Sequence, residues 1–144
     1  TSTDDDERYA ALYSLAHTEN LSLLEQTLAL ALSPLVRSQD SVYLIREVAR
    51  NIFGRTLAWN FVKTNWATLV ERYGQSTAMR HLVSIAHFFS DPSRYQEVRS
   101  FFRSHDAMAG KAEVDVSLDM IRSNQLFLSN HLDAISVWLS SHGF

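Results

Sequence analysis

Apolar residues recur along this chain at the spacing of buried helix faces. Six leucines make the stretch 21–32 almost continuously apolar, which is typical of a helix buried on more than one side. Over 55–73 the apolar residues keep helical spacing throughout. The pattern predicts helices over about 6–17, 21–32, 38–50, 55–73, 76–89, 92–103 and 112–128, with a final helix capped by Asn130.

Helix-breaking residues separate these stretches and do not interrupt them. The chain has two prolines and four glycines, far fewer than the turns of a β protein need. Asp91 followed by Pro92 is a strong helix start, because the carboxylate caps free N–H groups and proline fits the first turn. Thr64 is a candidate cap inside 55–73, which predicts a break there and gives eight or nine helices.

Short connections make consecutive helices neighbours in space. Antiparallel pairs stacked side by side are the simplest arrangement of such helices. We therefore expect residues 1–144 to form a single all-α domain, an irregular α-solenoid of the HEAT or armadillo kind, with a compact helix bundle as the alternative. A solenoid cut at the first helix would expose the apolar side of residues 9–15, so we expect the isolated chain to self-associate.

The charge balance and amino-acid content exclude several classes of function. A formal charge of −3 leaves no dense basic stripe for nucleic acid. Without cysteine the chain has no disulfide, thiolate zinc site or cysteine nucleophile. No apolar run approaches the roughly 18 residues of a membrane span, so we expect no membrane contact by this domain. Because the first residue is not Met, we expect this chain to be a piece of a longer protein. The sequence fits a cytoplasmic protein as well as a secretory protein or an ectoenzyme.

The residues that usually carry catalysis are scattered. None of the six histidines belongs to an H-E-x-x-H zinc motif, and there is no G-x-S-x-G or phosphate-binding loop. His81 and His87 would lie about 240° apart on a regular α-helix, on different faces. We expect no catalytic residue, metal ligand or cofactor site in this chain, which makes a small free-standing hydrolase the least favoured hypothesis.

Two arginines allow two interpretations. Arg46 and Arg50 lie one helical turn apart, so their guanidinium groups are neighbours on the surface of one helix. Pairing with Glu47, Asp40 or solvent, together with the favourable position of cations near a helix C-terminus, is the structural hypothesis. The functional hypothesis is an anion-binding site, for example for a peptide's terminal carboxylate, which suits the planar guanidinium fork.

The tryptophans are interpreted as core anchors. At helical spacing beside leucine and phenylalanine, such residues more often fill a core than form a binding platform. The side chains expected to anchor a buried helix pair are Leu57, Trp59, Phe61 and Trp66.

Several blocks of the sequence stand in a distinctive order. They are V-R-S-Q-D at 36–40, R-N-I-F-G-R-T-L-A-W-N-F-V-K-T-N-W at 50–66, R-Y-G at 72–74, I-R-S-N at 121–124 and W-L at 138–139. Together they resemble the C-terminal helical domain of the gluzincin zinc aminopeptidases, including the puromycin-sensitive, endoplasmic-reticulum, glutamyl and alanyl types, over nearly the whole chain. One departure is Gln125, which stands where the family often has an apolar residue.

The resemblance implies a larger enzyme whose chemistry lies outside this chain. The parent would carry an N-terminal domain and a zinc domain with H-E-x-x-H, and both would be partners of these helices in the same polypeptide. The helical domain, of which residues 1–144 would be the C-terminal part, would close over the catalytic domain and admit or hold peptide substrates. In the endoplasmic-reticulum members an arginine of this domain holds the substrate's C-terminus, and His17 stands at that position here.

The candidate substrate-facing residues are therefore His17, Arg46 and Arg50. An independent HEAT-like protein-interaction module is the alternative from a different class. The two hypotheses differ in what the reading frame upstream of Thr1 encodes, because only the aminopeptidase requires H-E-x-x-H there.

Overall fold

The structure of the chain, a computed structural model, describes residues 5–144, and all its regular elements are helical. The opening segment Thr1 to Asp4 lies outside the described residues. The α-helices are α1 (Asp5–Leu15), α2 (Leu21–Ala31), α3 (Ser38–Arg50), α4 (Arg55–Thr64), α5 (Trp66–Tyr73), α6 (Ala78–Val83), α7 (Pro92–Ser104) and α8 (Lys111–Ser141). Two short 3₁₀ helices, η1 (Ser84–Phe88) and η2 (Met108–Gly110), follow α6 and precede α8.

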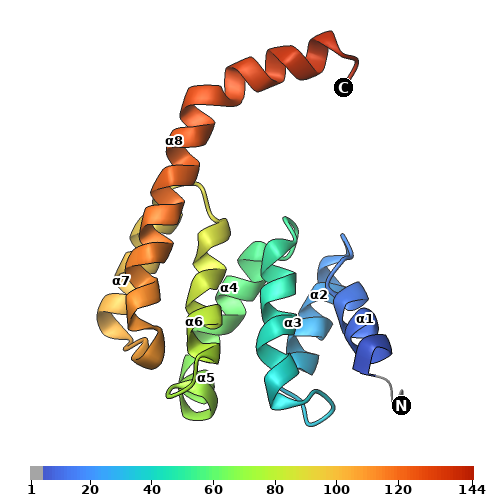
Figure 1. The fold of residues 1–144 in the computed structure, drawn as a ribbon, viewed down its shortest axis with the longest axis vertical. Coiled ribbons are helices and arrows are strands. Elements are labelled where there is room, and N and C mark those ends of the chain that lie inside the picture. The colour runs from blue at the N-terminus through green and yellow to red at the C-terminus, as the bar shows by residue number, and fades with distance from the viewer. Residues whose placement is uncertain (1–4) are drawn as a thin grey trace.

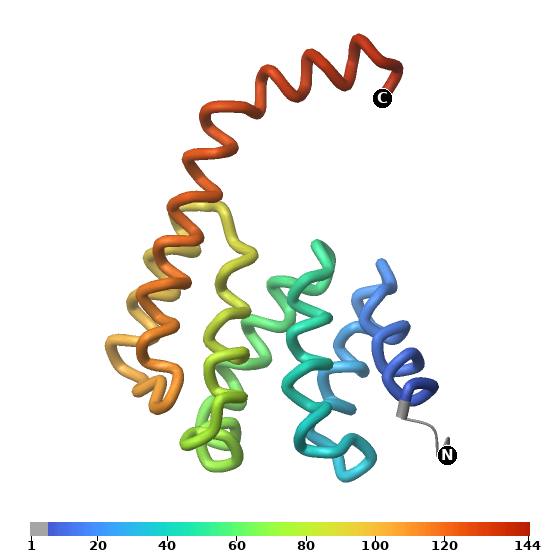
Figure 2. Tube along the Cα trace, viewed as in Figure 1, coloured from blue at the N-terminus to red at the C-terminus, as the bar shows by residue number. Residues whose placement is uncertain are grey.

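The helices form two layers (Figure 1). α1, α3, α6 with η1, and the first half of α8 lie side by side in one layer, and α2, α4 and α7 lie behind them. Consecutive helices such as α2 and α3, α3 and α4, and α7 and α8 are packed partners, as the tube in Figure 2 also shows. This confirms the predicted all-α, solenoid-like architecture.

An aromatic cluster fills the core between α4, α5 and α7. Trp59 is fully buried, and its ring meets Phe101 edge-on at 5.4 Å between centroids. Trp66 packs edge-on against both Phe101 at 5.4 Å and Phe102 at 5.5 Å. Such edge-to-face pairs contribute beyond the burial of their area. The other two expected anchors, Leu57 and Phe61, are half-buried and pack against this core.

The helix boundaries near Thr64 and Asp91 lie where the sequence predicts them. α4 ends at Thr64 and α5 begins at Trp66, although the polar side chain at the break is that of Asn65, which donates to the carbonyl of Phe61 (2.8 Å). The carboxylate of Asp91 accepts from the N–H of Arg94 (3.1 Å), with proline in the first turn of α7.

Two sequence predictions about helix ends are wrong. No helix begins at Asn130, because α8 continues unbroken from Lys111 to Ser141, and the stretch contains no glycine or proline to stop it. A cap residue works only on non-helical backbone, and Asn130 lies inside the helix. Ser76 does not cap α6 either, since its hydroxyl donates to the carbonyl of Tyr73 (2.9 Å).

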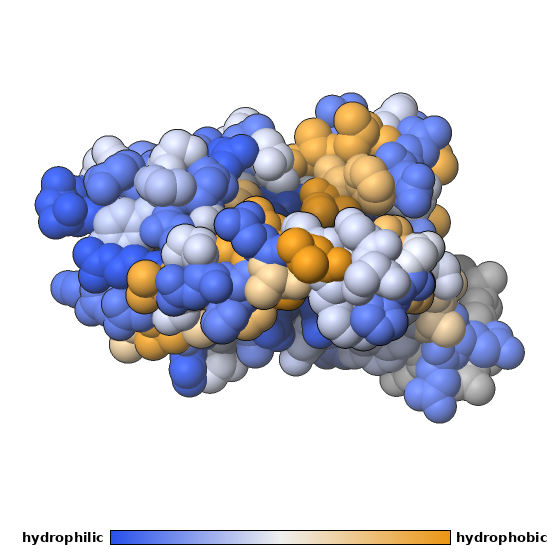
Figure 3. All heavy atoms as spheres, turned by 90° about the horizontal axis from the view of Figure 1, so that it is seen from above, coloured by the Kyte–Doolittle hydropathy of each residue, from blue (hydrophilic) through white to orange (hydrophobic). Residues whose placement is uncertain are grey.

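The two ends of the solenoid carry apolar side chains on the surface. Tyr9 and Tyr13 on α1 are 43% and 53% exposed, and the groove between α1 and α3 is mainly apolar. The second half of α8 extends beyond the two layers (Figure 1), and its exposed apolar residues include Phe127, Ile135 and Trp138. Apolar atoms are visible on the surface when the molecule is viewed from the end where α8 projects (Figure 3).

Glu97 connects α4 to α7 beside the aromatic cluster. One of its carboxylate oxygens accepts from the indole N–H of Trp59 (3.1 Å) and from Lys63, and the other accepts from Arg94 (2.7 Å). Burial raises the pKa of Glu97, but the hydrogen bonds and charges of Lys63 and Arg94 outweigh it and hold this pKa below its ordinary value. The charged form of Glu97 therefore stabilises the folded chain.

We expect Glu97→Ala to lower the free energy of unfolding by roughly 1–3 kcal/mol, because the buried Trp59 N–H loses its acceptor. Glu97→Gln keeps an acceptor oxygen and should cost roughly 1 kcal/mol. The folded-state pKa of Glu97 is lowered. The stability that its charged form adds is therefore present at neutral pH and is lost as the pH falls through that pKa. Urea unfolding at pH 7 and at about pH 3 measures the free energy of unfolding of the wild type and of each variant. If the difference between wild type and Glu97→Gln is larger at about pH 3 than at pH 7, the charged form of Glu97 does not stabilise the fold.

We expect the isolated chain to self-associate with increasing concentration, because the apolar faces of α1 and of the second half of α8 are exposed to water. Sedimentation velocity over a concentration series measures this. The double substitution Ile135→Glu with Trp138→Glu should shift the population towards monomer, whereas Leu35→Glu, which adds a charge in an exposed turn, serves as the control. A wild-type chain that stays monomeric at high concentration would refute the expectation.

Candidate functional site

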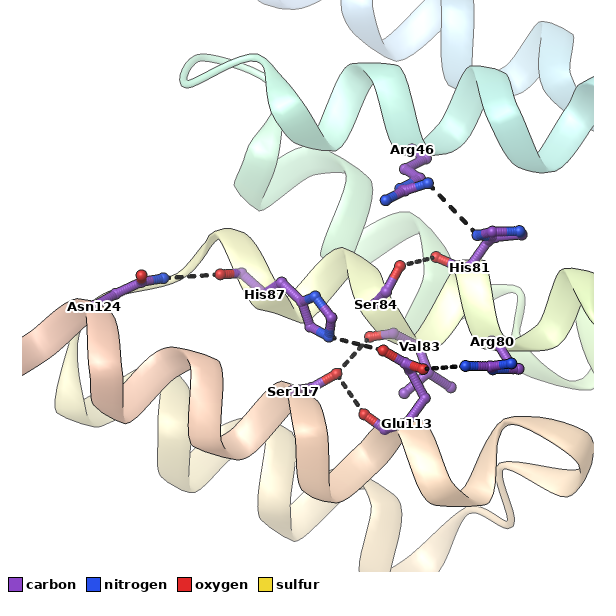
Figure 4. A network of polar contacts seen from close by, with 9 residues as sticks. All are labelled: Arg46, Arg80, His81, Val83, Ser84, His87, Glu113, Ser117 and Asn124. Carbon is purple, nitrogen blue, oxygen red and sulfur yellow. Dashed lines mark hydrogen bonds and ion pairs between the residues drawn. The ribbon is translucent and has the colours of Figure 1, made fainter.

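A polar pocket opens between α3, α6, η1 and the start of α8. Its volume is about 280 Å³. Seven side chains from these elements and the turn before α6 line it: Arg46, Thr77, Arg80, His81, Ser84, His87 and Glu113. Figure 4 shows Arg46 and His81 pointing towards one another and Glu113 lying between Arg80 and His87. Charged side chains from three helical segments meet around this cavity.

His81 and His87 line the same pocket, so the expectation that they occupy different faces is wrong. The reason is the change of helix type at Ser84, where α6 passes into the 3₁₀ helix η1. Three steps at about 100° and three at about 120° put the two residues about 60° apart, whereas six steps at about 100° would give about 240°, which is a separation of about 120°. The tighter helix thus turns His87 towards α8.

The start of α8 reaches this pocket because η2 packs closely on α6. A Cβ on Gly110 would lie 2.9 Å from a methyl group of Val83 and 3.1 Å from the carbonyl of Met79, so only glycine allows this approach. In the next turn Ser117 donates to the carbonyl of Val83 (3.3 Å). Farther along, Asn124 of the I-R-S-N block donates to the carbonyls of His87 and Phe89, both at 2.9 Å.

Glu113 lies between Arg80 and His87. One carboxylate oxygen lies 3.4 Å from Arg80, and the other lies 3.1 Å from Nε2 of His87. Burial lowers the pKa of His87, the charge of Glu113 raises it, and the charge of Arg46 lowers it, with a net result below the ordinary value. His87 is therefore mainly neutral at neutral pH.

Arg46 has no carboxylate partner among the described residues. Its Nη1 donates to Nδ1 of His81 at 3.5 Å, the limit of a hydrogen bond, and its Nε is buried without a partner. The neighbouring Glu47 points to the groove on the other side of α3, which it lines together with residues of α1. Arg46 is therefore not paired with Glu47 or Asp40, and its half-buried side chain keeps contact with solvent, which the structural hypothesis also includes.

Arg50 has the carboxylate partner that Arg46 lacks. Its Nη1 lies 3.2 Å from Glu47, and its side chain is 58% exposed. Arg50 does not line the pocket that holds Arg46. Asp40, the other carboxylate considered from sequence, is buried and pairs with Arg37 at 2.9 Å and with Arg8 at 3.5 Å.

His17 lies at the end of α1 and closes that helix. Its Nδ1 donates to the carbonyl of Tyr13 (2.7 Å), and its ring stacks on the Tyr13 ring at 4.1 Å. Two other helix ends repeat this arrangement of an aromatic residue four positions before a histidine, Phe101 with His105 and Trp138 with His142. With the proton on Nδ1, the neutral His17 ring offers only a lone pair at Nε2, so donating to an anion requires its imidazolium form.

The three residues singled out from sequence do not form one site. Arg46 lines the polar pocket, Arg50 pairs with Glu47, and no contact among the described residues connects His17 with either arginine. Sequence reasoning did not single out Arg80 and Glu113, which are distant in the chain and carried no local signal. Gln125, the departure from the family pattern, is half-buried, and its Nε2 has no partner among the described residues.

Within residues 5–144 no three His, Cys, Asp or Glu side chains are grouped so as to hold a metal ion. Over the same range, no helix combines the length and the apolar character required to cross a bilayer.

Known proteins match this chain over most of its length. Residues 1–123 match the family described as ERAP1-like C-terminal domain. The chain is 33% identical over 135 residues to the glutamyl aminopeptidase of Sus scrofa, which covers 92% of this chain and 14% of that protein. It is 32% identical over 145 residues to aminopeptidase A of Gloydius brevicauda (98% and 15%) and 31% identical over 136 residues to the thyrotropin-releasing hormone-degrading ectoenzyme of Rattus norvegicus (92% and 13%).

The chain thus spans only 13–15% of the length of these relatives. The family match extends over most of the solenoid, from α1 into α8, and includes the polar pocket. The chain therefore belongs to the ERAP1-like C-terminal domain family.

Proposed function

We propose that these helices form the C-terminal part of the helical domain of a larger zinc aminopeptidase. There they close the chamber over the active site and help to admit or hold peptides while the catalytic domain removes N-terminal residues. The observation that carries the proposal is the match of residues 1–123 to the ERAP1-like C-terminal domain family. Two relatives of this chain are named as aminopeptidases, and the chain covers only 14% and 15% of their length.

The proposal assigns the chemistry to other domains of the same polypeptide. Zinc would be bound by an H-E-x-x-H motif and a distant glutamate in the catalytic domain. The residues of this chain would shape the chamber and contact the peptide. The zinc domain and an N-terminal domain are the partners proposed for the exposed apolar faces of α1 and α8.

The gene provides the most direct test of this proposal. The reading frame upstream of Thr1 should encode H-E-x-x-H followed by a glutamate about twenty residues later. A native gene that begins at Thr1 would instead favour the independent HEAT-like interaction module. The isolated chain should show no peptidase activity when zinc is added, and robust zinc-dependent turnover would contradict the proposal.

In the complete protein, His17→Ala should lower kcat/KM for long peptides roughly two- to fivefold and leave single-residue substrates nearly unchanged. An exposed charge-assisted contact at this position is worth less than about 1 kcal/mol, which sets the size of the effect. His105→Ala is the matched control, because His105 makes the same contacts at the end of α7. If His17→Ala affects long and single-residue substrates equally, His17 serves only to close α1.

A further inference from the structure

We propose that Asn20, in the turn between α1 and α2, carries an N-linked glycan. The proposal goes beyond the proposed function and assigns a covalent modification site on the surface of the solenoid. It places this part of the chain in the lumen of the secretory pathway during synthesis, because such oligosaccharides are attached there.

The sequence around Asn20 is the first argument. Asn20-Leu21-Ser22 is an acceptor sequence of the form N-x-S with a residue other than proline in the middle. The chain has six asparagines, and Asn20 is the one followed two positions later by serine or threonine. Because such tripeptides are frequent, the fold must also offer this asparagine to a glycan.

The hydrogen bonds of the Asn20 amide are the second argument. Its oxygen Oδ1 accepts from the backbone N–H of Leu23 (3.2 Å) and so caps α2. Its nitrogen Nδ2, the atom to which the sugar is joined, donates to no acceptor among the described residues. A glycan replaces one hydrogen on Nδ2 and leaves Oδ1 an acceptor, so the modified residue still caps the helix.

Three of the other asparagines use the same nitrogen to hold the fold together. Nδ2 of Asn51 donates to two carbonyls of the α1–α2 turn, at 2.9 and 2.8 Å. Nδ2 of Asn65 donates to a carbonyl of α4 (2.8 Å), and that of Asn124 donates to two carbonyls at the end of η1, both at 2.9 Å. The remaining two asparagines lie inside α4 and α8. Asn20 therefore combines a position outside the helices with an amide nitrogen that the fold does not use.

The exposure of the turn is the third argument. Asn20 is exposed, and its backbone is extended (φ −77°, ψ 109°). The turn lies at one edge of the solenoid, beside the turn between α3 and α4 (Figure 2). The neighbouring side chains of Leu21 and Leu23 are 53% and 48% exposed. A bulky hydrophilic group therefore finds room here, and it would shield apolar side chains that otherwise contact water.

The attachment step takes place before the turn folds. Ser22, which completes the acceptor sequence, lies in the first turn of α2 in the folded chain, so the sugar is added to the extended chain. Nδ2 of Asn20 loses a proton and bonds to C1 of the first N-acetylglucosamine of an oligosaccharide linked to a lipid pyrophosphate. The bond between C1 and the pyrophosphate oxygen breaks, and the lipid pyrophosphate leaves with the electron pair. No oxidant or reductant is needed.

The test uses the complete protein, expressed from its own gene in animal cells. The peptide that contains Asn20 is analysed by mass spectrometry before and after treatment with peptide:N-glycosidase in water labelled with heavy oxygen. We expect the untreated peptide to carry N-acetylglucosamine and mannose. The treated peptide should contain aspartate at this position with one labelled oxygen atom.

Ser22→Ala and Ser22→Thr are the matched pair of variants. Both leave the Asn20 side chain in place as the cap of α2, but only threonine keeps the acceptor sequence. We expect Ser22→Ala to lose the glycan completely and Ser22→Thr to keep it. Asn20→Gln should also lose the glycan, but it removes the capping asparagine, so Ser22→Ala is the variant that separates the modification from the cap.

An unmodified Asn20 in the wild-type protein overturns the proposal, wherever in the cell the protein is found. A glycan that stays on this peptide in Ser22→Ala also overturns it, because the sugar would then be joined to a neighbouring hydroxyl group. Peptidase activity of the same preparation is measured separately, and its absence would contradict the proposed function without affecting the glycan site.

Discussion

The burial of Trp59 is the interaction on which the rest of the structure depends. Its ring is fully enclosed by phenylalanines of α7 and by Phe89 after η1, so one side chain fixes three segments at once. An indole N–H cannot be buried there without an acceptor, and Glu97 supplies one. Lys63 and Arg94 keep the carboxylate of Glu97 charged. The buried ring of Trp59 and the ion pairs of Glu97 therefore depend on each other.

The position of Phe89 in this core explains the geometry of the neighbouring polar pocket. Phe89 follows directly after η1. The side chain of Asn124 on α8 donates to the carbonyls of His87 and Phe89 and so holds this segment against α8. The helix tightens from Ser84 onwards, and this tightening brings His87 round to the face of His81. A cavity lined by cations and histidines is thus a consequence of how the core closes, and Arg46 enters it from α3.

The helices at the two ends of the solenoid keep apolar side chains on the surface. Each helix pair in such an array covers its neighbours, so the terminal elements keep apolar surface that another domain can bury. The relatives are about seven times as long as this chain, and two of them are named as aminopeptidases. Arg46 lines the polar pocket without a carboxylate partner among the described residues.

The sequence by itself determined the helices, most of their boundaries, the solenoid-like class and the family. These depend on local periodicity, on caps such as Asp91 with Pro92, and on blocks of residues that can be read along the chain. It could not determine that α8 continues past Asn130, that His81 and His87 share a pocket, or that Arg50 is paired while Arg46 is not. Those outcomes were decided by the tertiary structure, because they depend on which side chains from distant segments face each other once the core has set the rotation of each helix.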